Sequence, residues 1–312
     1  MKKIAYVFPG QGSQAVGMGQ SVAEANSNAK KIFEQADSRL GYSLSDIIFN
    51  GPIETLTLTT NAQPALLTTS IAIMQCLQAS GIQPDYTAGH SLGEYTALVA
   101  SGAINFEDAV YAVHKRGEYM EEAVPNGEGT MAAVLGLDRD VLKEVTEEVT
   151  SNGNSVQLAN LNCPGQIVIS GTVKGVEEAS ALAKEKGAKR ALPLQVSGPF
   201  HSQLMKPAAE KFKQVLQEIN IVDAQIPVIA NVTAEPMTNS EDIKEKLIEQ
   251  LYSPVQWEDS VRKMVDLGVD TFIEIGQGKV LSGLIKKINK EVKVYSIQDM
   301  ESCAQVVEEL KA

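Results

Sequence analysis

The feature of this chain that most constrains its fold is the five-residue run Gly89-His90-Ser91-Leu92-Gly93. The pattern Gly-x-Ser-x-Gly is typical of a nucleophile elbow, in which a serine lies on a sharp turn between a strand and a helix. Residues 85–88 precede the run as a short candidate strand, and residues 92–100 follow it as a series of helix formers. Strand, turn and helix therefore occur in the order that an elbow requires, which predicts an α/β fold with an exposed Ser91 hydroxyl.

The length and composition of the chain favour a globular protein of one or two domains. Of its 312 residues, 44% are hydrophobic, which is enough for a large buried core. Residues 1–8 begin like a signal peptide, but the apolar run ends at Pro9 and is too short for one, so we expect a core strand there. We find no segment long enough to span a membrane.

The charge of the chain argues against a nucleic-acid partner. Its 39 acidic and 27 basic residues give a net charge of −12, which repels nucleic acid on average. The simpler interpretation of this acidity is solubility. Local basic clusters can still contact an acidic partner, and the candidates are Lys189-Arg190, Lys206 and Lys286-Lys287.

The cysteines Cys76, Cys163 and Cys303 are widely separated and form no Cys-x-x-Cys pair. This distribution predicts neither a disulfide scaffold nor a cysteine-rich metal site. It is typical of a protein in a reducing cytoplasm.

Strands and helices alternate in the first part of the chain, which favours a parallel sheet covered by helices. We expect strands at residues 4–8 and 85–88 and helices at 23–36, 65–79 and 92–100. A further helix follows at 105–124, with Asn105 as its cap. After residue 197 the alternation resumes, with strands at 227–232 and 271–275 and a helix at 260–267.

Between these parts the pattern changes to that of a second, smaller domain. The segment begins with a strand (131–137) and a helix (138–150), followed by two strands around the turn at 162–165. It ends with a helix (176–186) and a strand (191–196). The order βαββαβ is that of a ferredoxin-like unit. We therefore predict a large α/β domain formed by residues 1–125 and 198–312, with a ferredoxin-like small domain, residues 126–197, inserted into it.

A serine nucleophile needs a base, and the chain has three histidines. His90 adjoins Ser91, but consecutive side chains diverge on a tight turn. His114 lies one position off the apolar stripe of its helix, so we expect it at the surface. His201 follows a strand in a loop rich in turn residues, where open α/β sheets place their chemistry, and we predict that it is the base.

The group that orients the imidazole is left open by the sequence. Three acidic residues, Glu258, Asp259 and Glu274, are candidates, and nothing distinguishes one of them. A backbone carbonyl fixes the tautomer of a histidine equally well.

Arg116 lies on the apolar stripe of the 105–124 helix, beside Gly117. An unpaired buried guanidinium is costly, so it must meet an anion or reach the surface. One interpretation pairs it with an internal carboxylate such as Glu94 or Glu118. The other is a bidentate contact with a carboxylate of the substrate, which predicts an acyl group that carries a free acid.

The loop after the first strand, Phe8-Pro9-Gly10-Gln11-Gly12-Ser13-Gln14, exposes backbone N–H groups next to the expected elbow. It lacks the pattern of a phosphate-binding P-loop. In an elbow enzyme one oxyanion donor is the N–H after the nucleophile, here that of Leu92, and the second comes from another loop. Gln11 is the natural second donor.

Taken together, these motifs resemble the malonyl-CoA:acyl-carrier-protein transacylase family over essentially the whole chain. The residues that carry the resemblance are Phe8-Pro9-Gly10-Gln11-Gly12, Gln63-Pro64-Ala65-Leu66, Gly89-His90-Ser91-Leu92-Gly93-Glu94, Arg116, Gly198-Pro199-Phe200-His201, Gln250 and Pro254-Val255-Gln256-Trp257.

The resemblance implies a role for each of these positions. Ser91 would be the nucleophile and His201 the base. Gln11 and Leu92 would supply the two oxyanion-hole donors, and Arg116 would bind the malonyl carboxylate. The main-chain carbonyl of Gln250 would hold the histidine. It further implies that Gln63 and Asn162 line the cleft, and that Leu92 and Phe200 select malonyl over methylmalonyl groups.

The same resemblance implies malonyl transfer from malonyl-CoA to acyl carrier protein in fatty acid synthesis, through a malonyl-serine ester and without a metal or redox cofactor. The carrier would dock on a basic patch, which we define as Lys189, Arg190, Lys286 and Lys287. Two alternatives are a serine hydrolase built on the same elbow and a non-catalytic protein that docks carriers.

Overall fold

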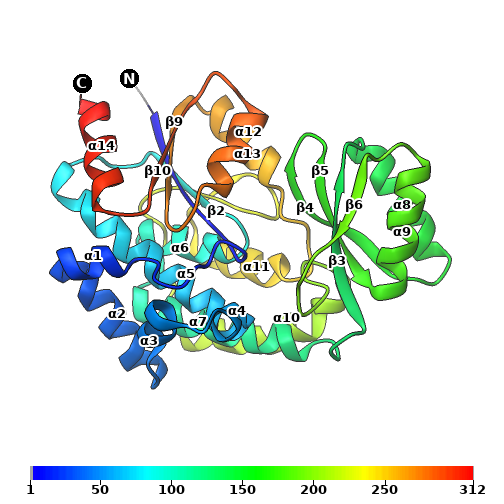
Figure 1. The fold of residues 1–312 in the computed structure, drawn as a ribbon, viewed down its shortest axis with the longest axis horizontal. Coiled ribbons are helices and arrows are strands. Elements are labelled where there is room, and N and C mark those ends of the chain that lie inside the picture. Colours follow the sequence, from blue (N-terminus) through cyan, green and yellow to red (C-terminus); the bar gives the residue numbers. More distant parts are fainter. Residues whose placement is uncertain (1–2, 312) are drawn as a thin grey trace.

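This computed structural model describes residues 3–311, which form two β-sheets with helices around them (Figure 1). The strands are β1 (Lys3–Phe8), β2 (Tyr86–Gly89), β3 (Gly129–Leu135), β4 (Val156–Cys163), β5 (Gln166–Thr172), β6 (Arg190–Pro193), β7 (Val228–Ile229), β8 (Pro236–Met237), β9 (Val269–Ile275) and β10 (Lys293–Ile297).

Most helices of the described residues belong to the first and last thirds of the chain. They are α1 (Gln20–Ala25), α2 (Ser27–Leu40), α3 (Leu44–Asn50), α4 (Ile53–Thr57), α5 (Thr59–Met74), α6 (Leu92–Ala100), α7 (Phe106–Glu122), α8 (Arg139–Ser151), α9 (Val173–Glu185), α10 (Lys206–Glu218), α11 (Ser240–Gln250), α12 (Trp257–Asp266), α13 (Val280–Ile288) and α14 (Met300–Lys311), with the short 3₁₀ turns η1 (Gln75–Ser80) and η2 (Gln203–Met205).

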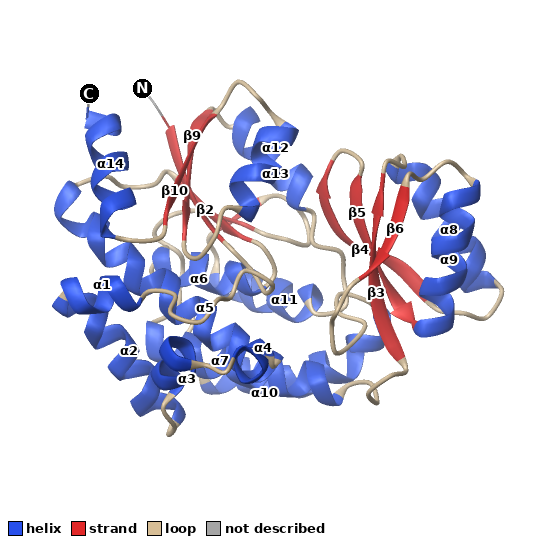
Figure 2. Ribbon diagram, viewed as in Figure 1, coloured by secondary structure: helices blue, strands red, loops and turns tan. Residues whose placement is uncertain are grey.

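The larger sheet has the strand order β10-β9-β1-β2-β7-β8 and is parallel except for β8. Strand β1 lies at its centre, paired with β2 on one side and β9 on the other. Its apolar sequence suits a strand that is buried on both faces. Ala5 and Val7 face a cluster formed with α12 and α13, whereas Tyr6 and Phe8 face the main core, so helices cover both sides of the sheet (Figure 2).

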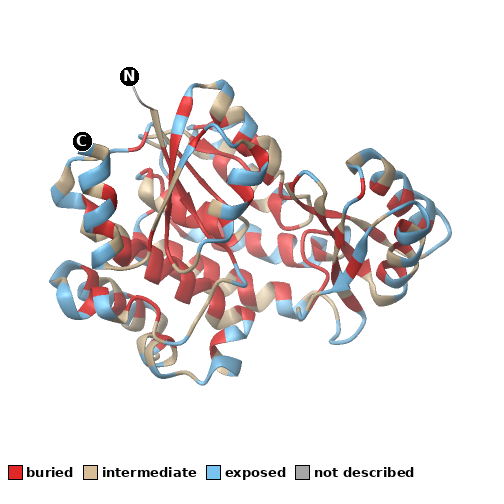
Figure 3. Cartoon of the chain, turned by 45° about the horizontal axis from the view of Figure 1, so that its top comes forward, coloured by how far each residue is buried: buried red, intermediate tan, exposed pale blue. Residues whose placement is uncertain are grey.

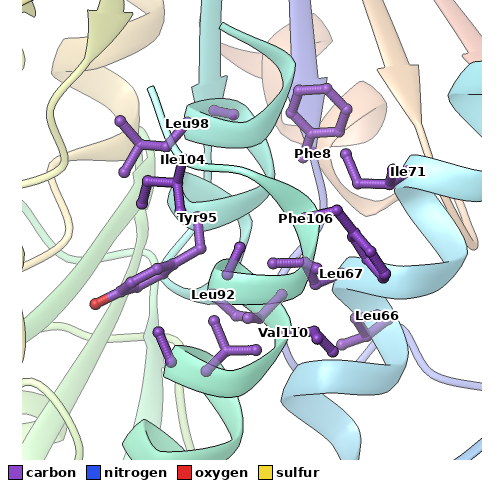
Figure 4. Packing of buried hydrophobic residues seen from close by; sticks show 14 of the residues in the cluster. Phe8, Leu66, Leu67, Ile71, Leu92, Tyr95, Leu98, Ile104, Phe106 and Val110 are labelled. Carbon is purple, nitrogen blue, oxygen red and sulfur yellow. The ribbon is translucent and has the colours of Figure 1, made fainter. Parts of the chain in front are cut away.

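Helix α6, which follows the elbow, is locked in place by this main core. Leu92, Tyr95 and Leu98 are fully buried on α6 and pack among residues of α5, α7 and β1 (Figure 4). Burial of one such side chain contributes roughly 1.5–3 kcal/mol. The start of α6 therefore has a fixed position relative to the end of β1, where the loop with Gln11 begins.

The smaller sheet is antiparallel, with the order β4-β5-β3-β6 and helices α8 and α9 packed on it. This is the predicted βαββαβ unit, and its elements fall inside the predicted insertion at 126–197. The domain boundaries themselves stay a prediction. Figure 3 shows that buried residues are concentrated in the larger sheet and its helices, while the outer helices of the small unit are largely exposed.

The two parts of the structure meet along strand β4. The Leu161 N–H donates to the Val255 carbonyl, and the Val255 N–H donates to the Ala159 carbonyl. These bonds join the edge of the small sheet to the segment between α11 and α12. The residues between the two sheets thus become the walls of a cavity, described below.

Most predicted elements are present, with shifts at their ends. Asn105 caps α7 as expected, since its side chain accepts the Asp108 N–H at 2.8 Å. The helix expected at 23–36 is two helices, α1 and α2, separated at Asn26, which caps the second one. The strand expected at 227–232 shortens to β7, and the strand expected at 191–196 ends at Pro193 as β6.

The distribution of the cysteines predicted no disulfide scaffold, yet the structure contains a disulfide. Cys76 of η1 and Cys303 of α14 form a disulfide across 227 positions of sequence, while Cys163 is a buried free thiol. The fold brings the two residues together through the packing of α14 against η1, which their spacing in the sequence does not reveal. Among the helices of residues 3–311, none has the length and apolarity needed to cross a membrane.

Candidate active site

Ser91 lies on the predicted elbow between β2 and α6. Its φ of 52° and ψ of −108° are unusual for a residue with a side chain, and such strain costs about 1–3 kcal/mol. The two flanking glycines make the turn possible, because a Cβ on Gly89 would collide with the Gly93 carbonyl and one on Gly93 would collide with the Phe8 carbonyl. The elbow sequence is thus required by close backbone packing.

Asn231 holds this strained turn from the other side. Its Oδ1 accepts the Ser91 N–H at 2.8 Å, and its Nδ2 donates to the Gly89 carbonyl at 2.7 Å. Asn231 is fully buried and follows β7, the neighbour of β2 in the sheet. We did not predict this residue, because an asparagine 140 positions away from the elbow carries no local signal.

The imidazole of His201 lies next to the Ser91 hydroxyl, with 2.7 Å between Nε2 and Oγ. The other ring nitrogen, Nδ1, lies 2.8 Å from the main-chain oxygen of Gln250. A carbonyl oxygen can only accept, so Nδ1 carries the hydrogen and Nε2 is left to accept the serine proton. His201 itself has a φ of 56°, a second strained residue at the same point.

None of the three acidic candidates orients this imidazole among the described residues. Glu258 and Asp259 both bind Arg139, at 3.4 and 2.8 Å. Glu274 accepts the backbone N–H groups of Leu281 and Ser282 at the start of α13. The backbone carbonyl, the alternative left open by the sequence, occupies the place of an acid.

His201 is buried and neutral at physiological pH. Burial, the positive charge of Arg116 and His90 lower its pKa from 6.5 to about 3, and hydrogen bonds to the backbone at Gln250 and Ser253 compensate only in part. A neutral imidazole at pH 7 retains the lone pair that a general base requires.

This shift predicts how the stability of the protein depends on pH. Between pH 6.5 and 3 the unfolded state binds a proton on His201 that the folded state does not, so stability falls as the pH falls. From pH 7 to 5 the wild type should lose about 2 kcal/mol more unfolding free energy than His201→Gln. Urea unfolding of both proteins at the two pH values measures this difference, and an equal loss would contradict the shift.

Arg116 is 1% exposed and reaches the same serine from helix α7. Its Nη2 donates to Ser91 Oγ at 3.1 Å and to Gln250 Oε1 at 2.8 Å, and its Nη1 donates to Gln63 Oε1 at 2.6 Å. Burial lowers its pKa, while the nearby Tyr95 and Glu94 raise it. Within residues 3–311, no acceptor lies within hydrogen-bond reach of its Nε.

The first interpretation of Arg116, an internal ion pair with Glu94 or Glu118, is wrong. Among the described residues, Glu118 pairs with Lys115 at 2.7 Å, and its other carboxylate oxygen lies 3.2 Å from His114 Nε2. Glu94 binds Gln250 instead. The direct partners of the guanidinium are therefore neutral oxygens, which leaves its charge available to an anionic group.

Gln63 and Gln11 belong to one hydrogen-bonded chain that leads from Arg116 to the first loop. Gln63 Nε2 lies 3.1 Å from Thr59 Oγ1, and this hydroxyl donates to Gln11 Oε1 at 2.9 Å. The side chain of Gln11 is thereby held next to the elbow. Leu92 is the first residue of α6, so its N–H has no acceptor within the helix.

A cavity of about 400 Å³ opens above these groups, between the two sheets. Gln11, Ser91 and His201 lie on its large-domain side, and the segment after β6 closes it from the small domain. The apolar part of the wall is formed by Leu58, Met120, Met131, Leu194, Val196 and Phe200. A short acyl chain of a thioester fits a space of this size and character.

Two other positions differ from what the sequence indicated. Asn162 bonds to Nε2 of His90 at 2.8 Å, while Asn160, which we did not predict, lines the cavity. His114 is less exposed than predicted: its side chain is 19% exposed, and its Nδ1 lies 3.0 Å from the Thr60 carbonyl. The apolar stripe did not reveal the neighbouring α5, which covers this side of α7.

Comparison with known families decides what kind of protein carries this site. A family model described as the acyl transferase domain matches residues 5–310. The chain belongs to the acyl transferase family. It is 64% identical over 311 residues to the malonyl CoA-acyl carrier protein transacylase of Bacillus subtilis (strain 168), and the match covers 100% of this chain and 98% of that protein.

Solved structures of this family share the fold. The malonyl CoA-acyl carrier protein transacylase of Coxiella burnetii superposes with a TM-score of 0.97 at 41% identity, covering 100% of this chain and 98% of that one. A malonyl-transacylase solved in complex with a type II polyketide synthase acyl-carrier protein gives a TM-score of 0.96 at 43% identity, with coverage of 99% and 100%.

Proposed function

We propose that this chain transfers a malonyl group from malonyl-CoA to the phosphopantetheine thiol of an acyl carrier protein, and so supplies malonyl-ACP for fatty acid synthesis. The proposal rests mainly on two contacts of Ser91 Oγ. His201 Nε2 lies 2.7 Å from it, and Arg116 Nη2 lies 3.1 Å from it. A base beside a hydroxyl suits acyl transfer, and a buried guanidinium at the same oxygen suits an acyl group with a free carboxylate. The names of the relatives support both.

In the first half-reaction His201 Nε2 takes the proton of Ser91 as its oxygen attacks the thioester carbonyl. The tetrahedral oxyanion would be held by the backbone N–H groups of Gln11 and Leu92. The carbon–sulfur bond then breaks, and the CoA sulfur leaves with the proton from the imidazole. A malonyl ester on Ser91 remains.

In the second half-reaction the thiol of the carrier takes the place of CoA. His201 removes its proton, the sulfur attacks the ester, and Ser91 recovers the proton as the new thioester forms. The scheme is a double displacement that uses residues of the chain and the two thiol substrates. We further propose that no metal or redox cofactor takes part and that the protein is located in the cytoplasm.

Arg116 would bind the malonyl carboxylate, oriented by Gln63, with Phe200 and the apolar wall enclosing the methylene group. Asn162 would act at the edge of this cleft through His90, its hydrogen-bond partner. Water must be kept from the ester, and the small domain, which closes one side of the cavity, can shield it.

Radiolabelled malonyl-CoA tests the proposal. The purified protein should acquire a covalent label that addition of acyl carrier protein removes and recovers on the carrier. A serine hydrolase, the main alternative, would release free malonate even with carrier present. No label on the protein at all would favour a non-catalytic, carrier-docking role.

The carrier-docking patch gives a prediction of its own. Lys189, Arg190, Lys286 and Lys287 are all exposed. Lys189 packs against Gly136, which bonds to the β4–β5 turn at Gly165, and Lys287 lies close enough to Cys163 in β4 to lower the pKa of its thiol, although burial raises it overall. The two pairs therefore flank the same turn.

Changing both Lys286 and Lys287 to Glu should raise the KM for the acidic carrier about tenfold, because rim charges act mainly on association. The reaction with malonyl-CoA should change far less. The matched control is Lys30→Glu with Lys31→Glu, an adjacent exposed pair on α2. Steady-state kinetics with each substrate measure the effect, and unchanged carrier kinetics would remove this pair from the docking surface.

A further inference from the structure

Glu94 is a carboxylate buried behind the reacting groups, to which the proposed mechanism gives no role. It lies in the first turn of α6, three residues after Ser91, and is 1% exposed. Burying a carboxylate costs free energy unless it is paired or hydrogen-bonded, so Glu94 requires partners inside the protein.

Each hydrogen bond that the structure gives Glu94 comes from an N–H donor. Gln250 Nε2 donates to Oε2 at 2.6 Å, and the Asn231 N–H lies 3.4 Å from both carboxylate oxygens. Burial raises the pKa of Glu94 to about 7, while these donors and the positive charges of Arg116 and Lys246 lower it. The carboxylate is therefore ionised in mildly alkaline solution.

The carboxylate determines which way round the Gln250 amide lies. Its Nε2 faces three oxygens, those of Glu94 at 2.6 Å, the Ser91 carbonyl at 3.0 Å and Asn231 Oδ1 at 3.3 Å. Its Oε1 is thereby directed to Arg116 Nη2 at 2.8 Å. A flipped amide would place its oxygen against a carboxylate and its NH₂ group against a guanidinium, two repulsive contacts in a buried site.

We propose that Glu94 is a positioning residue that acts through the side chain of Gln250 to hold Arg116 at the Ser91 hydroxyl. The inference rests on the proposed function of Arg116 as the ligand of the acyl carboxylate. The Glu94 side chain makes no hydrogen bond to the Ser91 hydroxyl or to Arg116; the fixed amide of Gln250 transmits its effect.

The change Glu94→Gln tests this positioning with little change of volume. One carbonyl oxygen remains, and it carries no charge. If the new NH₂ group faces Gln250 Nε2, two donors meet and the Gln250 amide must turn; if it faces the Asn231 N–H instead, the amide keeps an acceptor but loses the negative charge that fixes its orientation. In either case the hydrogen bond from Arg116 to Gln250 Oε1 is weakened and the guanidinium can move. Misplacement of a binding group by about 1 Å can cost on the order of 100-fold in rate.

At pH 8 we expect kcat/KM for malonyl transfer to fall about 10–100-fold in Glu94→Gln. Acetyl transfer and the rate at which phenylmethylsulfonyl fluoride modifies Ser91 should stay within about threefold of wild type, because neither needs the guanidinium. The matched control is Glu274→Gln, the other buried glutamate of the described residues, which accepts from the Leu281 N–H and from the N–H and hydroxyl of Ser282 at the start of α13. It should keep the wild-type ratio of malonyl to acetyl transfer.

An unchanged malonyl-to-acetyl ratio in Glu94→Gln would overturn the inference, and so would an equal loss of malonyl transfer, acetyl transfer and serine modification. A crystal structure of this variant gives a reading that needs no substrate. We expect a turned Gln250 amide and an Arg116 guanidinium that has moved away from Ser91, and unmoved side chains would contradict the proposal. Should the wild type itself fail to load malonyl, the proposed function would be wrong, while this structure would still decide the role of Glu94.

Discussion

The Ser91→Ala protein should form no acyl-enzyme, and malonyl transfer should fall by at least about 10⁴-fold. The Ser91 oxygen is the atom that meets both His201 Nε2 and Arg116 Nη2, so no other hydroxyl inherits its position without moving the base. Loss of the nucleophile removes covalent catalysis altogether, and what remains is binding and oxyanion stabilisation. Mass spectrometry of the intact protein after incubation with malonyl-CoA measures the adduct directly.

The matched control for this experiment is Ser101→Ala. Ser101 is also buried and follows the same helix, α6, but its hydroxyl donates to the Leu98 carbonyl at 3.0 Å and does not line the cavity. It should form the malonyl adduct at close to the wild-type rate. A malonyl adduct on Ser91→Ala would place the nucleophile elsewhere and would overturn the proposed mechanism.

The parts of this site that depend on local sequence could be predicted from it. The elbow needs glycines at fixed positions because backbone atoms approach closely, and both Gly89 and Gly93 prove to be in such contact. The α/β alternation and the βαββαβ order follow from hydrophobic periodicity, which each segment carries within itself. The resemblance to a known family then supplied the role of a backbone carbonyl at Gln250, which no side-chain pattern encodes.

The parts that depend on contacts between distant segments could not be predicted from local patterns. Asn231 reaches the elbow from another strand, and Glu94 contacts Gln250 across 156 positions of sequence. The Cys76–Cys303 disulfide likewise joins segments that only the packing of α14 brings together. Polar residues buried in this way appear in the sequence as ordinary helix or loop residues, because their hydrogen-bond partners are set by the tertiary fold.

The structure excludes one of the two interpretations of Arg116 and leaves the other as a proposal. The position of Arg116 on an apolar stripe required an anion, and the sequence offered internal carboxylates or a ligand. In the structure the Glu94 carboxylate does not contact the guanidinium, because the side-chain amide of Gln250 lies between them and bonds to both. The charge of Arg116 is thus balanced at a distance without being neutralised by contact, which suits the anion-binding role that we propose for it.

Arg116→Ala should therefore separate malonyl from acetyl transfer. Removal of one partner of a buried, hydrogen-bonded charge pair costs about 2–5 kcal/mol, so kcat/KM for malonyl-CoA should fall by roughly 30-fold to 5,000-fold. Acetyl-CoA presents no carboxylate, and its transfer should be retained or improved, since the acyl group no longer displaces a guanidinium from its partners. Parallel assays with malonyl-CoA and acetyl-CoA measure the two effects.

Two further variants determine whether charge or geometry matters at this position. Arg116→Lys keeps the charge but loses the planar fork, and should recover only part of malonyl transfer. Arg139→Ala removes an arginine that binds Glu258 and Asp259 away from the cavity, and should leave the preference for malonyl unchanged. If Arg116→Ala instead lost malonyl and acetyl transfer equally, Arg116 would support the fold of the site, and the selection of a carboxylate-bearing acyl group would have to come from other residues of the cavity.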